Sequence, residues 1–214
     1  MKACTDVSAL VKAHSQYGLR PFSPILTEIL RHFETLDNLK DRTVLELGPG
    51  NRVGLMRFLA QECAIKSIQG VGRSIQWPWT RHKAFIHAHV VNARLLDFLA
   101  QPQSAATYDL IYSRLVMEQH SIDPWILLSS QAYRQQFKKR RFTDFDESYP
   151  ASIPNLQAVF RQAWTRLRSG GMIVSQIGKR KYSALDRSFL DELKPRQIHA
   201  QDLGRLSRMV TLIK

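Results

Sequence analysis

The central part of the chain alternates between short apolar runs and segments in which apolar residues recur every three or four positions. The runs are rich in branched and aromatic side chains and end at glycine or polar residues, which is typical of buried strands. The segments between them, such as 53–59 and 156–167, show the spacing of amphipathic helices. The expected strands are residues 43–47, 65–71, 86–91, 108–113 and 170–178.

Regular alternation of strands and helices predicts an α/β fold, in which helices cover both faces of a parallel sheet. The end of the chain differs, because residues 196–202 and 207–213 are two β-prone runs separated only by a short turn at Gly204. Two strands this close cannot be joined by a crossover helix, so we expect them to pair antiparallel. The predicted sheet is therefore mostly parallel, with a reversed strand at the C-terminus.

The first 40 residues carry apolar side chains at helical spacing, and Pro21 and Pro24 divide them into two short helices. We therefore expect an N-terminal helical cap, residues 1–40, ahead of a domain formed by residues 41–214. Residues 129–154 interrupt the alternation at a place where a few residues would suffice. An insertion of this length is expected to be a lid or a binding element, and a solvated spacer is the alternative.

Lysine and arginine outnumber aspartate and glutamate by 31 to 18, which gives a net charge of +13 and a pI near 10.1. This balance favours phosphate-rich partners such as nucleic acid, although a well-solvated basic surface explains it equally well. The two cysteines, Cys4 and Cys63, have no metal-like spacing, so neither a disulfide framework nor a metal site is expected. The sequence offers no signal peptide and no apolar run of roughly 18 residues, so we expect a cytoplasmic protein without a transmembrane segment.

The motif with the most chemical content is VLELGPGNRVG, residues 44–54. It lacks the Lys-Ser/Thr pair of a P-loop, and its third glycine comes one position too late for a dinucleotide fingerprint. A carboxylate at Glu46, directly before a glycine turn, suits a ligand that carries a positive group. The glycines allow close approach to the backbone, and the following helix offers free N–H groups to a carboxylate. An amino-acid ligand carries both charges.

The stretch VLELGPG resembles the first motif of the class I S-adenosylmethionine-dependent methyltransferases. YDLIYSRLVMEQ (108–119) is similar to the fourth strand of that family, and LRSGGMIVSQI (167–177) to the lead-in of its fifth strand. The resemblance spans residues 41–214. It implies a Rossmann-like sheet of seven strands and S-adenosyl-L-methionine as the cofactor. It also implies that Glu46 serves the methionine ammonium group, while Gly48 and Gly50 pass beneath the cofactor with Asn51 nearby.

The chain departs from this family at the positions that usually hold the ribose and the adenine. Where the second strand usually ends in an acid that binds both ribose hydroxyls, this sequence has Gly72 followed by Arg73. Where the third strand usually leads into Asp-Ala, it has Asn92 and Ala93. The side-chain carbonyl of asparagine can still accept a hydrogen bond from the adenine amino group. A simple turn residue at Asn92 is the alternative reading, with Asp97 as the substitute contact.

Many relatives carry a Glu-His pair after the fourth strand, which ends beside the transferable methyl group. Here Ser113 lies at the end of that strand, and Glu118 and His120 follow with one residue between them. His120 is a candidate general base because the pKa of histidine lies near neutrality, and Glu118 is a second catalytic candidate. A structural or exposed histidine is the alternative.

The residues after the fourth strand also bear on the methyl acceptor. Methyltransferases of nucleic-acid bases often carry an Asn/Asp-Pro-Pro-aromatic element there, but this chain reads Ser-Arg-Leu-Val at 113–116. The expected function is therefore methyl transfer from S-adenosylmethionine to a small-molecule or lipid-like acceptor. Two alternatives stay open: an RNA-directed methyltransferase that uses basic runs such as KKRR (138–141), and a non-catalytic methyltransferase-like binding protein.

Overall fold

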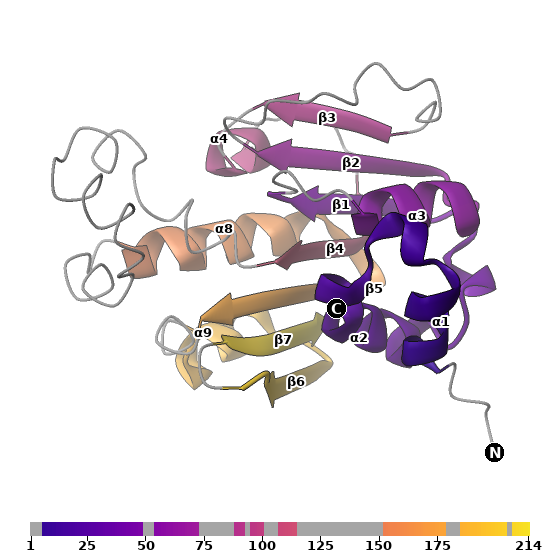
Figure 1. Ribbon diagram of the computed structural model, residues 1–214. Coiled ribbons are helices and arrows are strands. Elements are labelled where there is room, and N and C mark those ends of the chain that lie inside the picture. Colours follow the sequence, from indigo (N-terminus) through magenta and orange to yellow (C-terminus); the bar gives the residue numbers. More distant parts are fainter. Residues whose placement is uncertain are drawn as a thin grey trace, which may run out of the picture.

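The computed structural model describes residues 6–48, 54–72, 88–92, 95–100, 107–114, 152–178, 185–204 and 207–214. These residues form an α/β fold around one sheet of seven strands in the order β3-β2-β1-β4-β5-β7-β6 (Figure 1). The sequence prediction of an α/β class with a mostly parallel sheet is thereby confirmed. The strands are β1 (Thr43–Leu47), β2 (Ser67–Gly72), β3 (Ala88–Asn92), β4 (Tyr108–Arg114), β5 (Leu167–Gly178), β6 (Gln197–Asp202) and β7 (Ser207–Ile213).

Strands β1 to β5 run parallel to one another, whereas β7 lies antiparallel between β5 and β6. The turn between β6 and β7 is too short for a crossover, as the sequence indicated, so β7 must reverse direction. Within the described residues six α-helices accompany the sheet: α1 (Val7–Ala13), α2 (Ser23–Phe33), α3 (Gly54–Glu62), α4 (Leu95–Ala100), α8 (Ser152–Arg166) and α9 (Arg187–Leu193).

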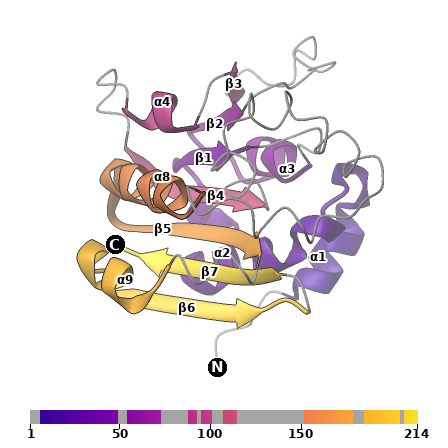
Figure 2. The same cartoon turned by 90° about the vertical axis from the view of Figure 1, so that its left-hand side faces the viewer.

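Two separate apolar cores lie on the two faces of the sheet. Helices α8 and α9 cover one face, and α2 and α3 cover the other, as Figure 2 shows. Along β1 the side chains alternate between these cores, because successive residues of a strand point to opposite faces. Leu45 belongs to the α8/α9 core, and Val44 to the α2/α3 core. This double coverage explains why the central strands read as continuous apolar runs.

The first 40 residues contribute α1, α2 and short 3₁₀ turns that pack on the α2/α3 side of the sheet. Ile25 and Ile29 of α2 are fully buried in the same core as Val44 of the sheet. The turn Ser15–Tyr17 lies against the start of α3, where a Cβ added at Gly54 would stand 2.0 Å from the carbonyl oxygen of Tyr17. Only glycine fits at this contact.

An ionic cluster ties β1 to β4 at the amino ends of these strands. The carboxylate of Asp109 accepts hydrogen bonds from the backbone N–H of Thr43 (2.8 Å) and from its hydroxyl (2.9 Å). Guanidinium nitrogens of Arg42 and Arg168 lie 3.3 and 3.0 Å from the same carboxylate. Burial acts to raise the pKa of Asp109, but the Thr43 hydrogen bonds and the two arginines outweigh it and lower that pKa. The cluster is satisfied within the fold and serves structure.

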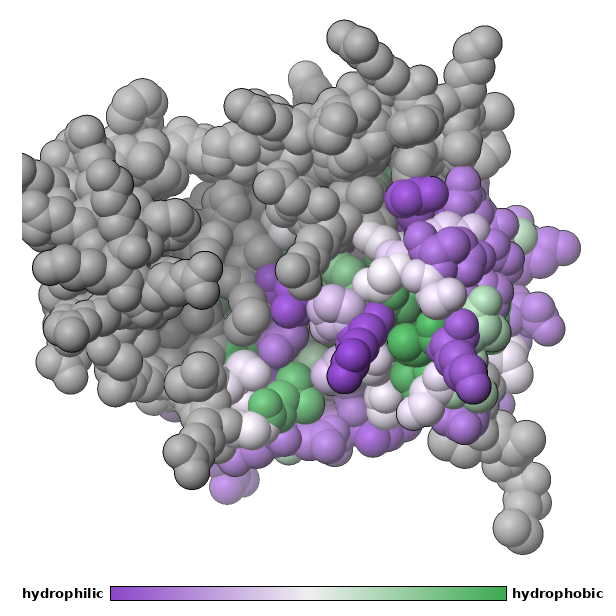
Figure 3. All heavy atoms as spheres, in the orientation of Figure 1, coloured by the Kyte–Doolittle hydropathy of each residue, from purple (hydrophilic) through white to green (hydrophobic). Residues whose placement is uncertain are grey.

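The surface of the described residues in this view is polar at its margins, and apolar side chains gather over the N-terminal helices (Figure 3). Within the described residues no helix is long and apolar enough to cross a membrane. Helix α8 begins at Ser152, so the last three residues of the expected insertion 129–154 are helical. The rest of that insertion lies outside the described residues, as do Gly50, Asn51, Arg73, Ala93, Glu118 and His120.

Candidate functional site

The order of the strands places a topological switch point between β1 and β4, and in open α/β sheets the carboxyl ends of the strands form a ligand-binding crevice at such a point. From β1 the chain proceeds outward to β2 and β3, and then returns to the other side of β1 with β4 and β5. The connections on the two sides of this point therefore leave in opposite directions, and ligands of open α/β sheets bind in the crevice so formed. In Figure 1 the arrowheads of β1, β2 and β4 all point to this edge of the sheet.

The register of the strands brings five of the expected site positions to this edge. Ser113 of β4 pairs with Leu47, directly after Glu46 in β1. On the other side of β1, Gly72 ends β2 and pairs with Asn92, the last residue of β3. Gly48 connects the two sides, because its N–H donates a 2.7 Å hydrogen bond to the carbonyl of Val71. The backbone positions expected to meet one ligand thus lie along one edge, although four strands supply them.

Glu46 is the charged group of this edge. Its side chain is only 2% exposed, and among the described residues its hydrogen-bond donor is the phenol of Tyr112, at 2.8 Å. No arginine, lysine or histidine of the described part of the chain forms an ion pair with it. Burial raises the pKa of Glu46 to about 8, against the opposite effect of the Tyr112 hydrogen bond. A strongly perturbed carboxyl group in a crevice is typical of a functional site.

Tyr112 was not among the residues that the sequence singled out. It lies directly opposite Glu46 in the pairing of β1 with β4, and its side chain is fully buried. Burial and the nearby Glu46 carboxyl raise the pKa of Tyr112 well above its ordinary value, so the phenol keeps its proton and donates. The alternation of side chains along YDLIYS could have shown that Tyr112 and Leu110 share one face of the sheet, the α2/α3 face. The sequence does not show the strand register that brings Tyr112 opposite Glu46.

Gly48 ends β1 in a left-handed conformation, with φ of 70°. A side chain at this position would be strained, so glycine allows the chain to turn sharply out of the strand at the crevice. The free N–H groups at the start of α3 follow six residues later, at Gly54. A helix N-terminus favours a negatively charged group. Helix α3 thus begins, six residues beyond Gly48, with N–H groups of the kind that suit a carboxylate.

Ser113 is placed at the crevice by its backbone, whereas its hydroxyl is already engaged. The Ser113 hydroxyl lies 2.7 Å from the hydroxyl of Ser175 on β5, and both side chains are fully buried. This pair lies on the α8/α9 face, opposite the face that carries Glu46 and Tyr112. The side chain of Ser113 therefore joins β4 to β5, and its backbone is what the crevice can use.

On the α2/α3 side, the N-terminal segment reaches the end of β4. The guanidinium of Arg114 stands 5.8 Å from the ring centre of Phe22, which belongs to the 3₁₀ turn Arg20–Phe22. Gln176 of β5 pairs with Arg114 and donates to the Ser207 hydroxyl at 3.1 Å.

The described residues contain no group of three His, Cys, Asp or Glu side chains that could hold a metal ion.

A scan against protein-family models finds no match to this sequence, and a search of curated proteins finds none either. Solved structures do match. The N-methyltransferase NodS from Bradyrhizobium japonicum WM9 is 14% identical, with 90% of this chain and 96% of that chain covered at a TM-score of 0.51. A methyltransferase from Pyrococcus furiosus is 11% identical, with 90% and 81% covered at a TM-score of 0.52. An rRNA methylase from Streptococcus thermophilus is 12% identical, with 87% and 95% covered at a TM-score of 0.50.

At identities of 11 to 14% these likenesses establish the fold. The chain shares the fold of these methyltransferases, in agreement with the fold that the motif resemblance implied. The similar proteins include one described as an N-methyltransferase and one described as an rRNA methylase. Because one fold serves different acceptors, the fold does not assign an acceptor to this chain.

Proposed function

We propose that this protein binds S-adenosyl-L-methionine in the crevice at the carboxyl ends of β1 and β4 and transfers its methyl group to a small-molecule or lipid-like acceptor. The observation that carries the proposal is the buried Glu46 carboxyl, whose described surroundings supply one neutral donor, Tyr112, and no cation. A buried carboxylate without a cationic partner is costly. A ligand ammonium group would supply the missing charge, and the aminoacyl end of the methyl donor carries one.

The remaining residues of the crevice fit the other parts of this ligand. The carboxylate beside the ammonium group suits the N–H groups at the start of α3, near Gly54. The left-handed turn at Gly48 leaves space for a ligand to cross the strand end. The neighbouring ends of β2 and β3, Gly72 and Asn92, are the positions for the ribose and the adenine. When bound, the donor supplies an electrophilic methyl group on a sulfonium sulfur.

Glu46 has a second task, which concerns a proton. With a pKa of about 8, its carboxyl group is mostly protonated at neutral pH before the ligand arrives. A ligand ammonium favours the ionised form, so Glu46 releases its proton as the ligand binds. Tyr112 then donates its hydrogen bond to a full negative charge, which makes that bond stronger. The pair therefore holds the charged form of Glu46 only when the ligand is present.

The chain needs little acid–base chemistry for the transfer itself. Orientation of a nucleophile against the methyl group can supply much of the rate enhancement. His120 and Glu118 stay as candidates for removing a proton from the acceptor. A small-molecule or lipid-like acceptor is our first choice, because the residues 115–120, LVMEQH, resemble enzymes with such acceptors.

Two alternatives rest on particular observations. The net charge of +13 favours an RNA acceptor, and phosphate contacts would make RNA affinity fall steeply with salt. Gly72, in the place of the ribose-binding acid, favours a protein that keeps the fold without catalysis. Incubation with methyl-labelled donor and separate pools of small amines, phenols, lipids and RNA distinguishes these readings. We expect label in a small-molecule or lipid pool; label in RNA alone, or in no pool, would contradict the first choice.

A further inference from the structure

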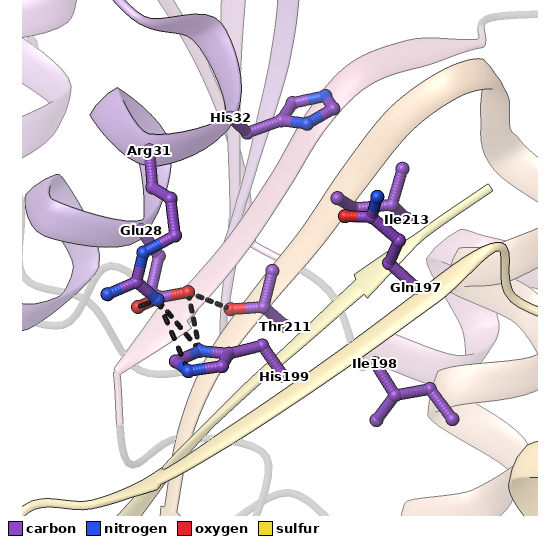
Figure 4. A pocket seen from close by; sticks show the side chains of 8 residues that line it. All are labelled: Glu28, Arg31, His32, Gln197, Ile198, His199, Thr211 and Ile213. Atoms are coloured by element: carbon purple, nitrogen blue, oxygen red, sulfur yellow. Dashed lines mark hydrogen bonds and ion pairs between the residues drawn. The ribbon is translucent and has the colours of Figure 1, made fainter. Parts of the chain in front are cut away.

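A second recess lies away from the crevice, where α2 passes over the outer strands β6 and β7 (Figure 4). Its volume is about 560 Å³. Helix α2 contributes Glu28, Arg31 and His32, and the strands contribute Gln197, His199 and Thr211. None of these residues belongs to the crevice around Glu46, so the recess calls for a separate explanation.

In this recess a buried carboxylate lies beneath two exposed basic side chains. The Glu28 carboxylate is only 2% exposed and accepts hydrogen bonds from the Thr211 hydroxyl (2.9 Å) and from Arg31, with Nδ1 of His199 at 3.0 Å. Above it, Arg31 and His199 are 51% and 46% exposed. Figure 4 shows the Arg31 guanidinium in contact with the His199 imidazole beside the buried carboxylate, with Nη1 of Arg31 2.9 Å from Nδ1 of His199. A partner entering the recess therefore meets a guanidinium and an imidazole, because the acid lies beneath them.

The recess borders the free edge of the sheet. Strand β6 is the last strand in the order, and all six of its residues are exposed. The N–H of Leu203 donates to the carbonyl of Ser207 (2.9 Å), and antiparallel pairs alternate in their hydrogen bonds. The backbone N–H and C=O groups of Ile198 and Ala200 therefore point outward, away from β7. The strand QIHAQD contains neither the lysine nor the proline that often protects such an edge.

We propose that β6 receives an extended acidic peptide segment of a partner protein as an additional strand. Hydrogen bonds to the outward backbone groups of Ile198 and Ala200 would hold the segment, and alternate side chains would decide its sequence. On the α2 face its acidic side chains meet Arg31 and His199. On the opposite face an apolar side chain packs beside Ile198, which is an exposed large hydrophobic residue at 46%. The preferred segment alternates acidic and apolar residues.

An acidic partner fits this edge better than a second copy of the chain. A net charge of +13 opposes self-association and attracts acidic chains. The exposed residues Lys194 and Arg196, directly before β6, extend the positive character along the strand. The inference is independent of methyl transfer, because no residue of the recess takes part in the proposed donor site.

The test uses two fluorescein-labelled peptides, one of alternating glutamate and valine and one of alternating lysine and valine. Fluorescence anisotropy measures their binding to the full-length protein at low and high salt. Ala200→Pro removes an outward N–H at a sheet edge, where proline is tolerated. Arg31→Gln removes the exposed charge and can still donate to Glu28. Arg187→Gln is the matched control, because Arg187 is 95% exposed on α9 at the other face of the sheet.

The wild-type protein is expected to bind the glutamate peptide and not the lysine peptide. Arg31→Gln should weaken binding about fivefold or more, and added salt should weaken it as well. Ala200→Pro should abolish binding, and Arg187→Gln should leave it unchanged. Four results would overturn the proposal: no binding of the glutamate peptide at millimolar concentration, equal binding of both peptides, wild-type affinity in Arg31→Gln, or a dimer in sedimentation that Ala200→Pro dissociates. If Ala200→Pro does not fold, Arg31→Gln still decides the question.

Discussion

The phenol of Tyr112 donates a 2.8 Å hydrogen bond to the carboxyl group of Glu46. The two residues lie opposite each other on neighbouring strands, and both side chains are buried. Among the described residues Tyr112 is the hydrogen-bond partner of Glu46. Burial raises the pKa of Glu46 to about 8. The buried carboxyl is therefore mostly protonated at pH 7 in the free protein, and a cation that reaches it favours the charged form. The predictions below start from this pair.

The first prediction concerns stability against pH in the absence of ligand. The folded-state pKa of Glu46, about 8, lies above its ordinary value of 4.5. The contribution of the protonated Glu46 carboxyl to the free energy of unfolding is therefore fully present below pH 4.5 and is lost as the pH rises through about 8. Glu46→Gln removes this loss, so the stability of the wild type should fall relative to the variant by up to about 1.4 kcal/mol per pH unit across that window.

Urea unfolding at several pH values between 5 and 9 measures this difference. Glu192→Gln is a suitable control, because Glu192 is exposed and its pKa is lowered by Arg161, so it does not titrate in this range. Parallel pH profiles for the wild type and Glu46→Gln would contradict the raised pKa.

The second prediction concerns Tyr112→Phe, which removes the phenol and keeps the ring. Without this donor the pKa of Glu46 rises further, because the Tyr112 hydrogen bond acts to lower it. Binding of S-adenosylmethionine should weaken by about 0.5–1.5 kcal/mol, the net contribution of a typical hydrogen bond. The pH at which affinity reaches its plateau should also move upward, which loss of packing alone would not cause.

Titrations of the donor at several pH values detect both effects. Tyr108→Phe is the matched control. Tyr108 lies on β4, as Tyr112 does, but its phenol donates to Gln69 of β2 at 2.7 Å and does not contact Glu46. A plateau at the same pH in Tyr112→Phe and in the wild type would show that the phenol does not act on Glu46.

The third prediction concerns Gly72, which stands where the family that the sequence resembles usually has an acid that holds the ribose. Gly72 ends β2 in a strand pairing with Asn92, so the backbone there is extended. Gly72→Asp should tighten binding of the methyl donor by about 1–3 kcal/mol, or roughly five- to 150-fold, through charge-assisted hydrogen bonds to the ribose hydroxyls. The double variant with Arg73→Ala removes a cation that would compete for the new carboxylate. Unchanged affinity in both folded variants would show that the ribose is not held at Gly72.

The fourth prediction concerns the contact between the N-terminal segment and α3. Gly54→Ala places a methyl group where the Tyr17 carbonyl oxygen would stand at 2.0 Å, so the segment must shift. Destabilisation of about 1–3 kcal/mol is expected, as for other overpacked contacts. Limited proteolysis should also cleave the N-terminal segment faster. Gly204→Ala is the control, because it adds the same methyl group in open space at a φ of 91° and so reports backbone strain alone.

Most of the sheet could be predicted because its strands are buried on both faces. A strand such as β1 or β4 is mostly apolar in that position, and glycine and polar residues mark where each strand ends. The antiparallel end of the sheet also followed from the sequence, since the turn at Gly204 leaves no room for a crossover. Strand ends were less certain: β5 begins at Leu167, before the glycine pair that the sequence suggested as its start.

The candidate site could be predicted only where a local motif carried the information. Glu46 and Gly48 follow from the order of residues along β1. Tyr112 does not, because it reaches Glu46 across 66 residues through the register of two strands. Gly54 was expected to belong to a ligand loop, and its contact with Tyr17 comes from a segment whose packing no local pattern shows. Ser113 was likewise expected near the ligand, and the structure engages its hydroxyl with Ser175.

The measurement that tests the account most directly is calorimetric titration of S-adenosylmethionine and S-adenosylhomocysteine into the wild-type protein and into Glu46→Ala. The wild type should bind both ligands and release a proton near pH 7, seen as a heat that depends on the ionisation enthalpy of the buffer. Glu46→Ala, with an unchanged circular dichroism spectrum, should lose about 1.5–3 kcal/mol of binding free energy, or roughly ten- to 150-fold in affinity. Absence of binding to the wild type at millimolar ligand, or equal affinity in the folded variant, would contradict a donor site at Glu46.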